Sequence, residues 1–245
     1  KRKLERQYNR SIERISRKAQ NACNMAKSPQ QLANMLNTIV HSQEFRAASY
    51  KAASRMVTNV GKGNFASWRE ASRNIGKGHD IFEALRNEIS NSPLQHIMET
   101  RAYENALYIQ TIGDDLVHKV TKRAQELALS GQRPAELAEE IWLQIPDMSF
   151  GHAKTIARTE VSKTNTDLIE ARSDRLDIRW YIWKSSKDSR VRSSHAHLDG
   201  VLIPWTEPPS PEKLDGAKRT YGNYHAVCIF NCRCYPEPVI DLRQV

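Results

Sequence analysis

The sequence predicts an α+β protein with a mostly helical N-terminal region and a small β-rich C-terminal domain. Apolar residues recur at helical spacing through most of residues 1–175, which predicts helices. From residue 178 onward, aromatic and β-branched residues alternate with other residues, which is typical of strands. We therefore expect three segments: a basic helical arm with an irregular helical region (1–90), a second helical region (91–175) and a small β-rich domain that holds cysteines and histidines (176–245).

The composition of the 245-residue chain, with 39% hydrophobic and 27% charged residues, is typical of a globular protein. The sequence contains no run of about 20 apolar residues, the length that a membrane-spanning helix needs. Its first residues do not have the pattern of a secretory signal. An intracellular protein is therefore expected.

Residues 1–20 predict a basic amphipathic helix. They hold eight lysines and arginines but two glutamates, so most of the net charge of +9 lies in this segment. Leu4, Tyr8, Ile12 and Ile15 recur at helical spacing. The basic residues lie mostly off this stripe and are predicted to bind DNA or an acidic protein partner: Lys1, Arg2, Lys3, Arg6, Arg10, Arg14 and Arg17. An anionic membrane surface and a solvated face without a ligand are the alternatives.

Local signals set the expected starts and ends of the next helices. Ser28 before Pro29 predicts an N-cap followed by a proline in the first helical turn. The two glycines of NVGKGN, residues 59–64, predict a break in the helical pattern. Asp114 or Asp115 is expected to cap a new helix that continues toward residue 128.

The last helix, expected to follow Ser149, carries Glu160 on its apolar face. Glu160 either lies at the edge of this face or is buried and paired with an arginine. Bidentate pairs between arginines and carboxylates would join this helix to the β-rich domain. The predicted charged network consists of Arg158, Glu160, Asp188, Arg190 and Arg192.

Two strands and a third extended stretch are expected in the C-terminal domain. IRWYIWKSS (178–186) and GVLIPW (200–205) predict the strands, and the third stretch is expected over residues 226–235. A domain of about 70 residues buries little apolar surface, so we expect an additional element to stabilise it.

The cysteines of this domain predict a zinc site. Because side chains alternate along an extended segment, Cys228, Cys232 and Cys234 are expected on one face. Cysteine and histidine side chains in a tetrahedral arrangement bind zinc. The predicted Zn²⁺ ligands are His195, Cys228, Cys232 and Cys234, with His225 or His197 as substitutes. Buried reduced thiols and a disulfide are the alternatives, and the lack of a secretory signal argues against a disulfide.

Three motifs together resemble the phage Mu F-like minor head protein family, whose domain is also called the phage head morphogenesis domain. They are ARTEVSKTNTDLIEAR (157–172), WKSSKDSRVRSSHAHLDG (183–200) and NCRCYPEP (231–238). The resemblance covers residues from about 110 to 240, and the occurrence of all three motifs in this order makes it specific. One departure is visible, because relatives commonly have a Pro-Gly pair where this chain has HAVC (225–228).

The resemblance implies a minor structural protein of a tailed-phage or prophage head, without enzymatic activity. It implies association with the portal protein or the major capsid protein during head assembly, and an effect on packaged double-stranded DNA and its ejection. Contact with this DNA is expected through the basic helix and without dependence on sequence. The implied location is the virion, in the capsid interior or at the portal vertex, and the host cytoplasm during assembly.

Two alternatives come from other functional classes. A cluster of histidines and asparagines near the cysteines is similar to the site of a His-Asn-His metal-dependent nuclease: His195, His197, Asn223, His225 and Asn231. The prolines at 236 and 238 leave little room for the helix that usually carries the last histidine of such a site. A sequence-independent DNA-binding module, which would act through the basic helix, is the other alternative.

Overall fold

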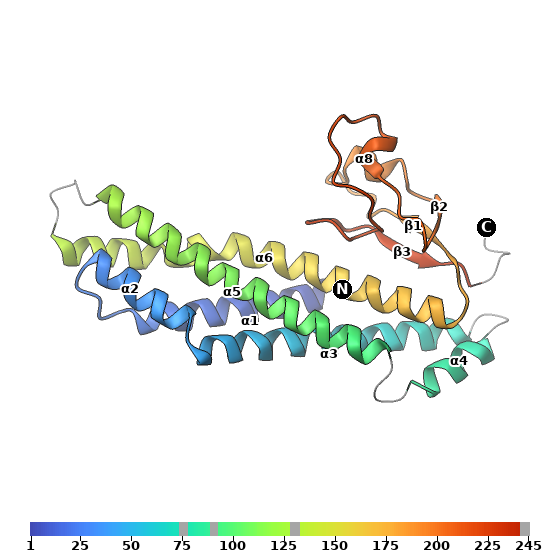
Figure 1. Cartoon of the computed structure of the whole chain (residues 1–245), viewed down its shortest axis with the longest axis horizontal. Coiled ribbons are helices and arrows are strands. Elements are labelled where there is room, and N and C mark those ends of the chain that lie inside the picture. Colours follow the sequence, from blue (N-terminus) through green and yellow to red (C-terminus); the bar gives the residue numbers. More distant parts are fainter. Residues whose placement is uncertain (74–77, 89–92, 128–132, 241–245) are drawn as a thin grey trace. The chain divides into compact units, whose positions relative to one another are not determined.

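The computed structural model describes residues 1–73, 78–88, 93–127 and 133–240. The predicted α+β class is confirmed, because helices form the N-terminal region and a small antiparallel sheet lies near the C-terminus (Figure 1). The elements are α1 (Arg2–Ala22), α2 (Pro29–Val40), α3 (Gln43–Arg73), α4 (Gly78–Arg86), α5 (Pro93–Leu127), α6 (Pro134–Arg175), β1 (Trp180–Lys184), α7 (Ser193–Ala196), β2 (Leu202–Pro204), α8 (Pro211–Leu214) and β3 (Tyr235–Pro238).

The chain folds into two compact units, each built from separate stretches of sequence. One unit consists of Lys1, Val57–Glu99 and Arg158–Val245, and the other of Arg2–Met56 and Thr100–Ala157. The division at residues 90 and 175 that the sequence pattern suggests stays a prediction. Among the described residues, none of the helices combines the length and the apolar character needed to cross a membrane.

Helix α1 confirms the basic amphipathic helix predicted for residues 1–20. Its apolar stripe is packed inside its unit, with Tyr8, Ile12 and Ile15 buried. The Tyr8 hydroxyl donates a hydrogen bond to Oδ1 of Asn105, at 3.2 Å, which ties α1 to α5. The segment is therefore a packed helix and not a free arm, because burial of this stripe holds it against its neighbours.

The sequence signal for the start of α2 is confirmed. Ser28 has an extended backbone, and its Oγ accepts a hydrogen bond from the backbone N–H of Gln31, at 3.2 Å. Pro29 is the first helical residue, where its missing N–H leaves no hydrogen bond unmade.

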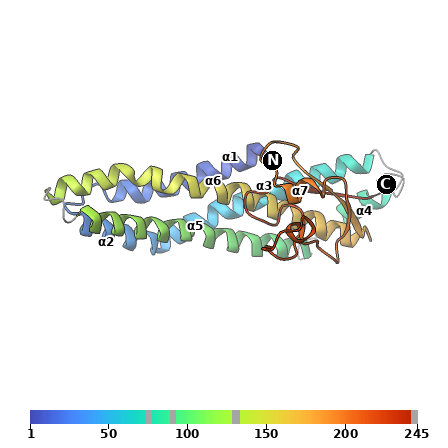
Figure 2. The same cartoon turned by 90° about the horizontal axis from the view of Figure 1, so that it is seen from above.

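Two long helices continue where breaks were predicted (Figures 1 and 2). Helix α3 runs through residues 59–64, and a Cβ added at Gly61 would lie 3.1 Å from Cε of Met98. Gly61 thus serves close packing between helices, which outweighs its poor helix propensity. Helix α6 likewise runs past Ser149 and contains Pro146 in its interior, so the predicted start after Ser149 is wrong.

Helix α5 also continues through the predicted start at Asp114 or Asp115, and Gly113 explains why. A Cβ added at Gly113 would lie 2.9 Å from Cγ1 of Val40 and 3.3 Å from the Phe45 ring. The glycine lets the helix backbone approach these two apolar side chains closely. The local composition suggested a helix end, but tertiary packing keeps α5 continuous.

The sheet has β1 in the centre, with β2 and β3 antiparallel on its two sides. Tyr181 pairs with Ile203 of β2, and Trp183 pairs with Pro236 of β3. The strands predicted over 178–186 and 200–205 are confirmed by β1 and β2. Alternate residues of β1 point into a buried core, which consists of Tyr181, Trp183, Leu198, Ile203, Tyr224, Ala226, Ile229, Cys232 and Cys234.

The extended stretch predicted over residues 226–235 is wrong for most of its length, because β3 begins only at Tyr235. The preceding segment turns twice, with left-handed backbone at Val227 (φ 82°) and Asn231 (φ 57°). Asparagine adopts this conformation readily, whereas a β-branched residue such as valine is strained there. The alternation of side chains along a strand therefore does not apply between Cys228 and Cys232.

Candidate metal centre

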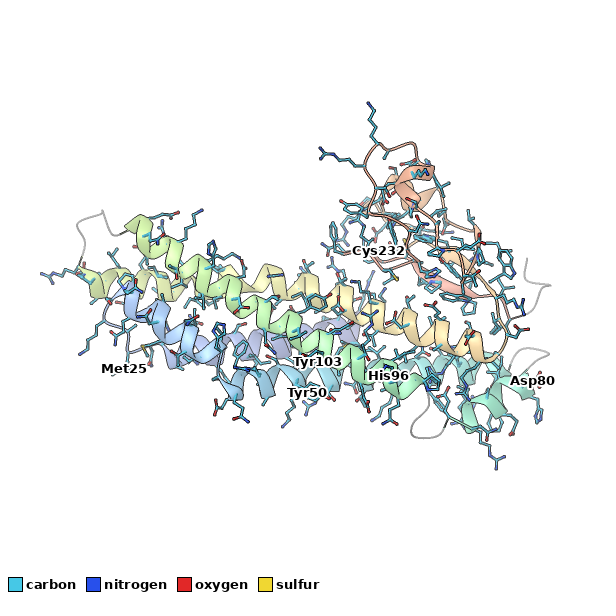
Figure 3. The ribbon with its side chains drawn as sticks, viewed as in Figure 1. Met25, Tyr50, Asp80, His96, Tyr103 and Cys232 are labelled. Atoms are coloured by element: carbon cyan, nitrogen blue, oxygen red, sulfur yellow. The ribbon has the colours of Figure 1, made fainter. Side chains whose placement is uncertain are left out.

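Three buried side chains of the C-terminal domain bring potential metal ligands together: His195, Cys232 and Cys234. Nδ1 of His195 lies 3.4 Å from Sγ of Cys232 and 3.5 Å from Sγ of Cys234. All three ligand atoms lie within 4.8 Å of one another. The cluster lies in the domain that carries the label of Cys232 in Figure 3.

Local structure brings these residues together from two segments. His195 is on the short helix α7, whose first turn forms after Arg192, and the His195 N–H donates to the Arg192 carbonyl at 3.0 Å. Cys232 and Cys234 are two residues apart on the segment that leads into β3, so their side chains point to the same side. The ring of Trp183, on the central strand, meets the His195 ring edge-on at 5.4 Å.

A hydrogen-bond chain behind His195 fixes which ring nitrogen faces the sulfurs. Nε2 of His195 lies 2.9 Å from the Tyr224 hydroxyl, which donates a hydrogen bond to Oε1 of Glu212 at 2.5 Å. Because the hydroxyl proton goes to Glu212, the tyrosine oxygen accepts the Nε2 proton. In the neutral form of the ring, Nδ1 then carries the lone pair and faces the two sulfurs.

The ionisation of Glu212 and Tyr224 supports this direction of hydrogen bonding. Burial works against a charged Glu212, but hydrogen bonds from Tyr224 and from backbone N–H groups lower its pKa below the ordinary value. Burial, together with the bond to Glu212, raises the pKa of Tyr224. Glu212 is therefore the acceptor and Tyr224 keeps its proton.

The two thiols of the cluster have opposite pKa shifts. The hydrogen bond from Cys234 lowers the pKa of Cys232, against the opposing effect of burial. The same sulfur–sulfur bond raises the pKa of Cys234, and burial adds to this. The cluster thus favours a first thiolate at Cys232.

A small cavity of about 10 Å³ lies beside the cluster. Its walls include His195, Cys232 and Cys234, and three arginines also line it: Arg190, Arg192 and Arg233. A cavity of this size has room for about one water molecule.

The other predicted zinc ligands lie elsewhere or have other partners. Cys228 is half-buried at the edge of the apolar core and is not part of the three-residue group. Nδ1 of His225 lies 3.1 Å from the Tyr181 hydroxyl, and burial lowers the pKa of His225. Exposed His197 lies 2.6 Å from Oδ1 of Asp215. All four cysteines of the chain are among the described residues, and none of them forms a disulfide.

The predicted charged network forms with different partners. Asp188 pairs with Arg233, which the sequence analysis missed, and accepts a hydrogen bond from the Arg190 backbone N–H at 3.0 Å. The Arg192 guanidinium donates to the carbonyl of Phe230 at 3.1 Å and lies 5.0 Å from the centre of its ring.

Hydrogen bonds at Asn231 join α6 to the segment that carries the cysteines. Arg158 donates to Oδ1 of Asn231 at 3.3 Å, and the Asn231 N–H donates to Oγ1 of Thr159 at 3.1 Å. Glu160 is buried, as in the second predicted alternative, but its Oε1 lies 3.6 Å from Nζ of Lys163, a lysine where that alternative had an arginine. The two hydrogen bonds hold the left-handed turn that precedes Cys232.

A buried ion pair that the sequence pattern did not predict links α6 to Glu88, the second residue after the end of α4. The guanidinium of Arg172 donates two hydrogen bonds of 2.8 Å to the two carboxylate oxygens of Glu88. It also donates to Oδ1 of Asn64 on α3. Arg172 stands in the first sequence motif, but Glu88 lies 84 residues earlier, so no local pattern relates the two.

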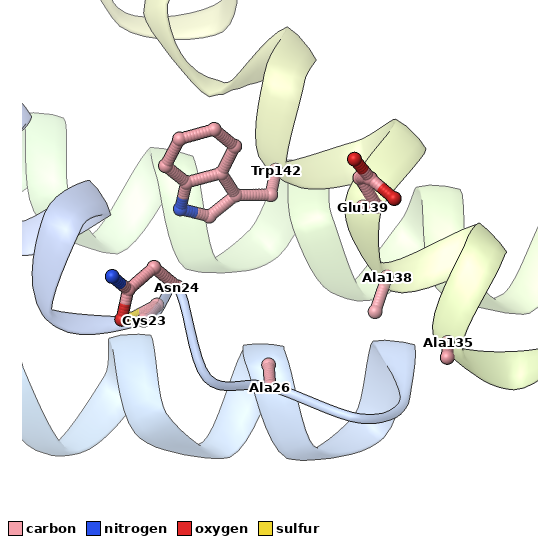
Figure 4. Close-up of a pocket in the computed structure, with 7 residues that line it drawn as sticks. All are labelled: Cys23, Asn24, Ala26, Ala135, Ala138, Glu139 and Trp142. Carbon is pink, nitrogen blue, oxygen red and sulfur yellow. The ribbon is translucent and has the colours of Figure 1, made fainter.

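A second pocket, of about 290 Å³, lies in the unit formed by Arg2–Met56 and Thr100–Ala157 (Figure 4). Trp142 of α6 and the turn at Cys23 and Asn24 form two of its walls, and alanines line much of the remainder. Burial raises the pKa of Cys23 to about 11, so this thiol stays protonated near neutral pH. The pocket therefore offers no thiolate for chemistry or metal binding.

The basic residues predicted as a binding surface are all exposed. They are Lys1, Arg2, Lys3, Arg6, Arg10, Arg14 and Arg17, at and along the solvent-facing side of α1. Packing of the apolar stripe leaves this side facing solvent.

Comparisons with known proteins give two matches. The sequence model of the family described as Phage Mu protein F like protein matches residues 115–236, a range that includes all three members of the metal-ligand cluster. An uncharacterized protein of Haemophilus influenzae (strain KW20 / Rd) is 29% identical over 184 residues, which is 74% of this chain. The match spans 38% of that relative's own length. No solved structure matches the chain.

Proposed function

Residues 115–236 match the sequence model of the Phage Mu protein F-like family, and from this match we propose that the chain is a minor structural protein of a tailed-phage or prophage head. The family match is the observation that carries the proposal. The matched range contains most of α6, the whole sheet except its last two residues, and the cluster of His195, Cys232 and Cys234.

The proposed protein partner is the portal protein or the major capsid protein. Two exposed aromatic residues of the C-terminal domain support a protein contact: Tyr221 and Phe230 meet edge-on at 5.6 Å, and the half-buried Arg192 lies over the Phe230 ring. Aromatic residues and arginine are enriched where proteins bind one another. Head assembly is the setting in which such a contact would form.

The proposed DNA contact uses the exposed basic face of α1 and depends on phosphate groups alone. Lysine and arginine side chains that displace counterions from DNA give binding that weakens steeply with salt. Replacement of Arg6, Arg10, Arg14 and Arg17 by glutamine should weaken binding to duplex DNA of any sequence and reduce the salt dependence. The matched control replaces four exposed basic residues of α3 instead: Lys51, Arg55, Lys62 and Arg69.

The head assignment is tested on particles of the phage or prophage that encodes the chain. Particles are separated on density gradients, and the protein is detected with an antibody in empty and DNA-filled heads. We expect it in purified heads, and we expect fewer complete heads when its gene is deleted. Absence from heads, with head yield unchanged by the deletion, would contradict the proposal.

The geometry favours a structural role over the nuclease alternative. A metal-dependent nuclease needs a general-base histidine beside an open metal site. His225 and His197 are bonded to Tyr181 and Asp215, so these two histidines do not converge with His195. A plasmid-nicking assay with Mg²⁺, Mn²⁺ and Zn²⁺ should show no cleavage, and cleavage abolished by His195→Ala would restore the nuclease alternative.

A further inference from the structure

We propose that His195, Cys232 and Cys234 bind one Zn²⁺ ion, with a water molecule from the arginine-lined cavity as the fourth ligand. In a tetrahedral site, a Zn–N bond of about 2.05 Å and a Zn–S bond of about 2.3 Å separate nitrogen and sulfur by about 3.5 Å. Nδ1 of His195 lies 3.4 and 3.5 Å from the two sulfurs. Both nitrogen–sulfur distances thus already match a tetrahedral ion, and all three ligand atoms lie within 4.8 Å of one another.

The donor set selects zinc over harder cations. Two thiolates and an imidazole suit Zn²⁺, whereas Mg²⁺ and Ca²⁺ prefer oxygen ligands. Two thiolates also neutralise the charge of the ion, so the complex is neutral in its buried position. This matters because all three side chains are at most 3% exposed, where an uncompensated charge would be strongly unfavourable.

The surroundings of His195 match those of a zinc-bound histidine. Metal-bound histidines almost always donate their second ring N–H to a carboxylate, a carbonyl or a water molecule, which fixes the tautomer. Here Nε2 donates to Tyr224, which donates in turn to Glu212. This chain is buried and complete, and it leaves the Nδ1 lone pair for the ion.

The fourth ligand follows from the cavity beside the cluster. The cavity touches His195 and both cysteines and has room for about one water molecule. Cys228 is not in the cluster, because the turns at Val227 and Asn231 separate its position from that of Cys232. The site therefore has three protein ligands and one solvent position.

The ion would fasten two parts of the domain that are distant in sequence. It would link α7 to the segment before β3, which is held to α6 through Asn231. We expect zinc to stabilise the C-terminal domain and the position of this segment, a role that does not depend on the protein being a head component.

The test measures the zinc content of the purified 245-residue chain by inductively coupled plasma mass spectrometry. We expect one zinc per chain in the wild type, loss of zinc in Cys232→Ser, Cys234→Ser and His195→Ala, and a lower Tm after chelation. Two matched controls, Cys23→Ser and Cys228→Ser, should keep the ion. Loss of zinc from Cys228→Ser would contradict the proposal that a water molecule is the fourth ligand. Retention of zinc by Cys232→Ser or Cys234→Ser would contradict the proposal that these cysteines bind the ion.

A second measurement keeps the test valid if a variant fails to fold. Chelated wild-type protein is reloaded with Co²⁺, whose absorption reports thiolate ligands and tetrahedral geometry. We expect thiolate-to-cobalt bands and visible bands of tetrahedral intensity, which added Zn²⁺ removes. A wild-type chain that contains no zinc and gives no such bands, or that shows a Cys232–Cys234 disulfide by mass spectrometry when purified without added oxidant, would overturn the proposal.

Discussion

The Tyr224 hydroxyl lies 2.9 Å from Nε2 of His195, on the side of the ring opposite to the two sulfurs. Because Glu212 takes the tyrosine proton, Tyr224 can only accept from the histidine. In the neutral imidazole, one hydroxyl group therefore determines that the nitrogen facing Cys232 and Cys234 carries the lone pair. In the proposed zinc site, Tyr224 would thus orient His195 without contributing a ligand atom itself.

Tyr224→Phe should weaken zinc binding by about 10- to 100-fold, the range for loss of a partner behind a metal ligand. The phenyl ring preserves most of the packing, but Nε2 loses its acceptor and the tautomer is no longer fixed. Competition with a chromophoric chelator measures the affinity. Tyr221→Phe, at an exposed tyrosine, is the control and should bind zinc as the wild type does. Equal affinities in the two variants would show that Tyr224 does not prepare the site.

The sequence predicts those parts of the structure that are determined by residues close to one another along the chain. The apolar stripe of Tyr8, Ile12 and Ile15 predicts α1, and the alternating residues of 178–186 predict β1, because both patterns repeat within a few residues. The association of His195 with two of the cysteines was also predicted, from the chemistry of their side chains.

Cys228 lies outside the cluster for a physical reason. Assigning Cys228 to the same face as Cys232 assumed an extended backbone, whereas Val227 and Asn231 adopt positive φ angles. Tyr224 was missed because its bond to His195 joins residues 29 positions apart, and no periodic pattern reports such a pairing.

Arg172→Ala should lower the free energy of unfolding by about 3 kcal/mol, because it leaves the carboxylate of Glu88 poorly paired in a largely buried position. This value is the lower end of the usual range, since Arg175 lies 3.9 Å from the same carboxylate and compensates in part. Urea titration followed by circular dichroism measures the change.

The exposed pair of Arg179 and Asp177 is the control for the buried ion pair, because its side chains are 76% and 79% exposed. Arg179→Ala should change stability by less than about 1 kcal/mol. The double variant Arg172→Met, Glu88→Leu should be more stable than Arg172→Ala alone, since it leaves no unpaired charge. An Arg172→Ala variant as stable as Arg179→Ala would show that the buried pair contributes little.

Gly113→Ala and Gly63→Ala should change stability in opposite directions, although both place alanine in the interior of a helix. At Gly63 nothing lies within 4 Å of the added Cβ, so the better helix propensity should stabilise by about 0.5–1 kcal/mol. At Gly113 the Cβ would lie 2.9 and 3.0 Å from two atoms of Val40. This overpacking should exceed the propensity gain and leave a net loss of about 1 kcal/mol. Thermal unfolding of both variants tests this, and stabilisation by Gly113→Ala would contradict the close approach of α5 to Val40.

Asp199 should make the stability of the C-terminal domain depend on acid pH. The Ser185 backbone N–H donates to Oδ1 of Asp199 at 2.7 Å, and this bond, aided by Lys187, lowers the pKa of Asp199 below its ordinary value of 3.8. Protonation therefore favours the unfolded chain. The stabilisation is complete above the unfolded pKa of about 4 and is lost as the pH falls through the lower folded pKa.

The measurement compares urea midpoints of the wild type and Asp199→Asn between pH 7 and pH 3. Asp199→Asn should be less stable at pH 7, and the difference should shrink below about pH 4 as the wild-type carboxylate is protonated. Any acid effect on the cysteines is common to both proteins and cancels in the difference. Asp177→Asn, at a side chain that is 79% exposed, should show little difference at any pH. A difference between wild type and Asp199→Asn that stays constant down to pH 3 would mean that the carboxylate charge at Asp199 does not stabilise the fold.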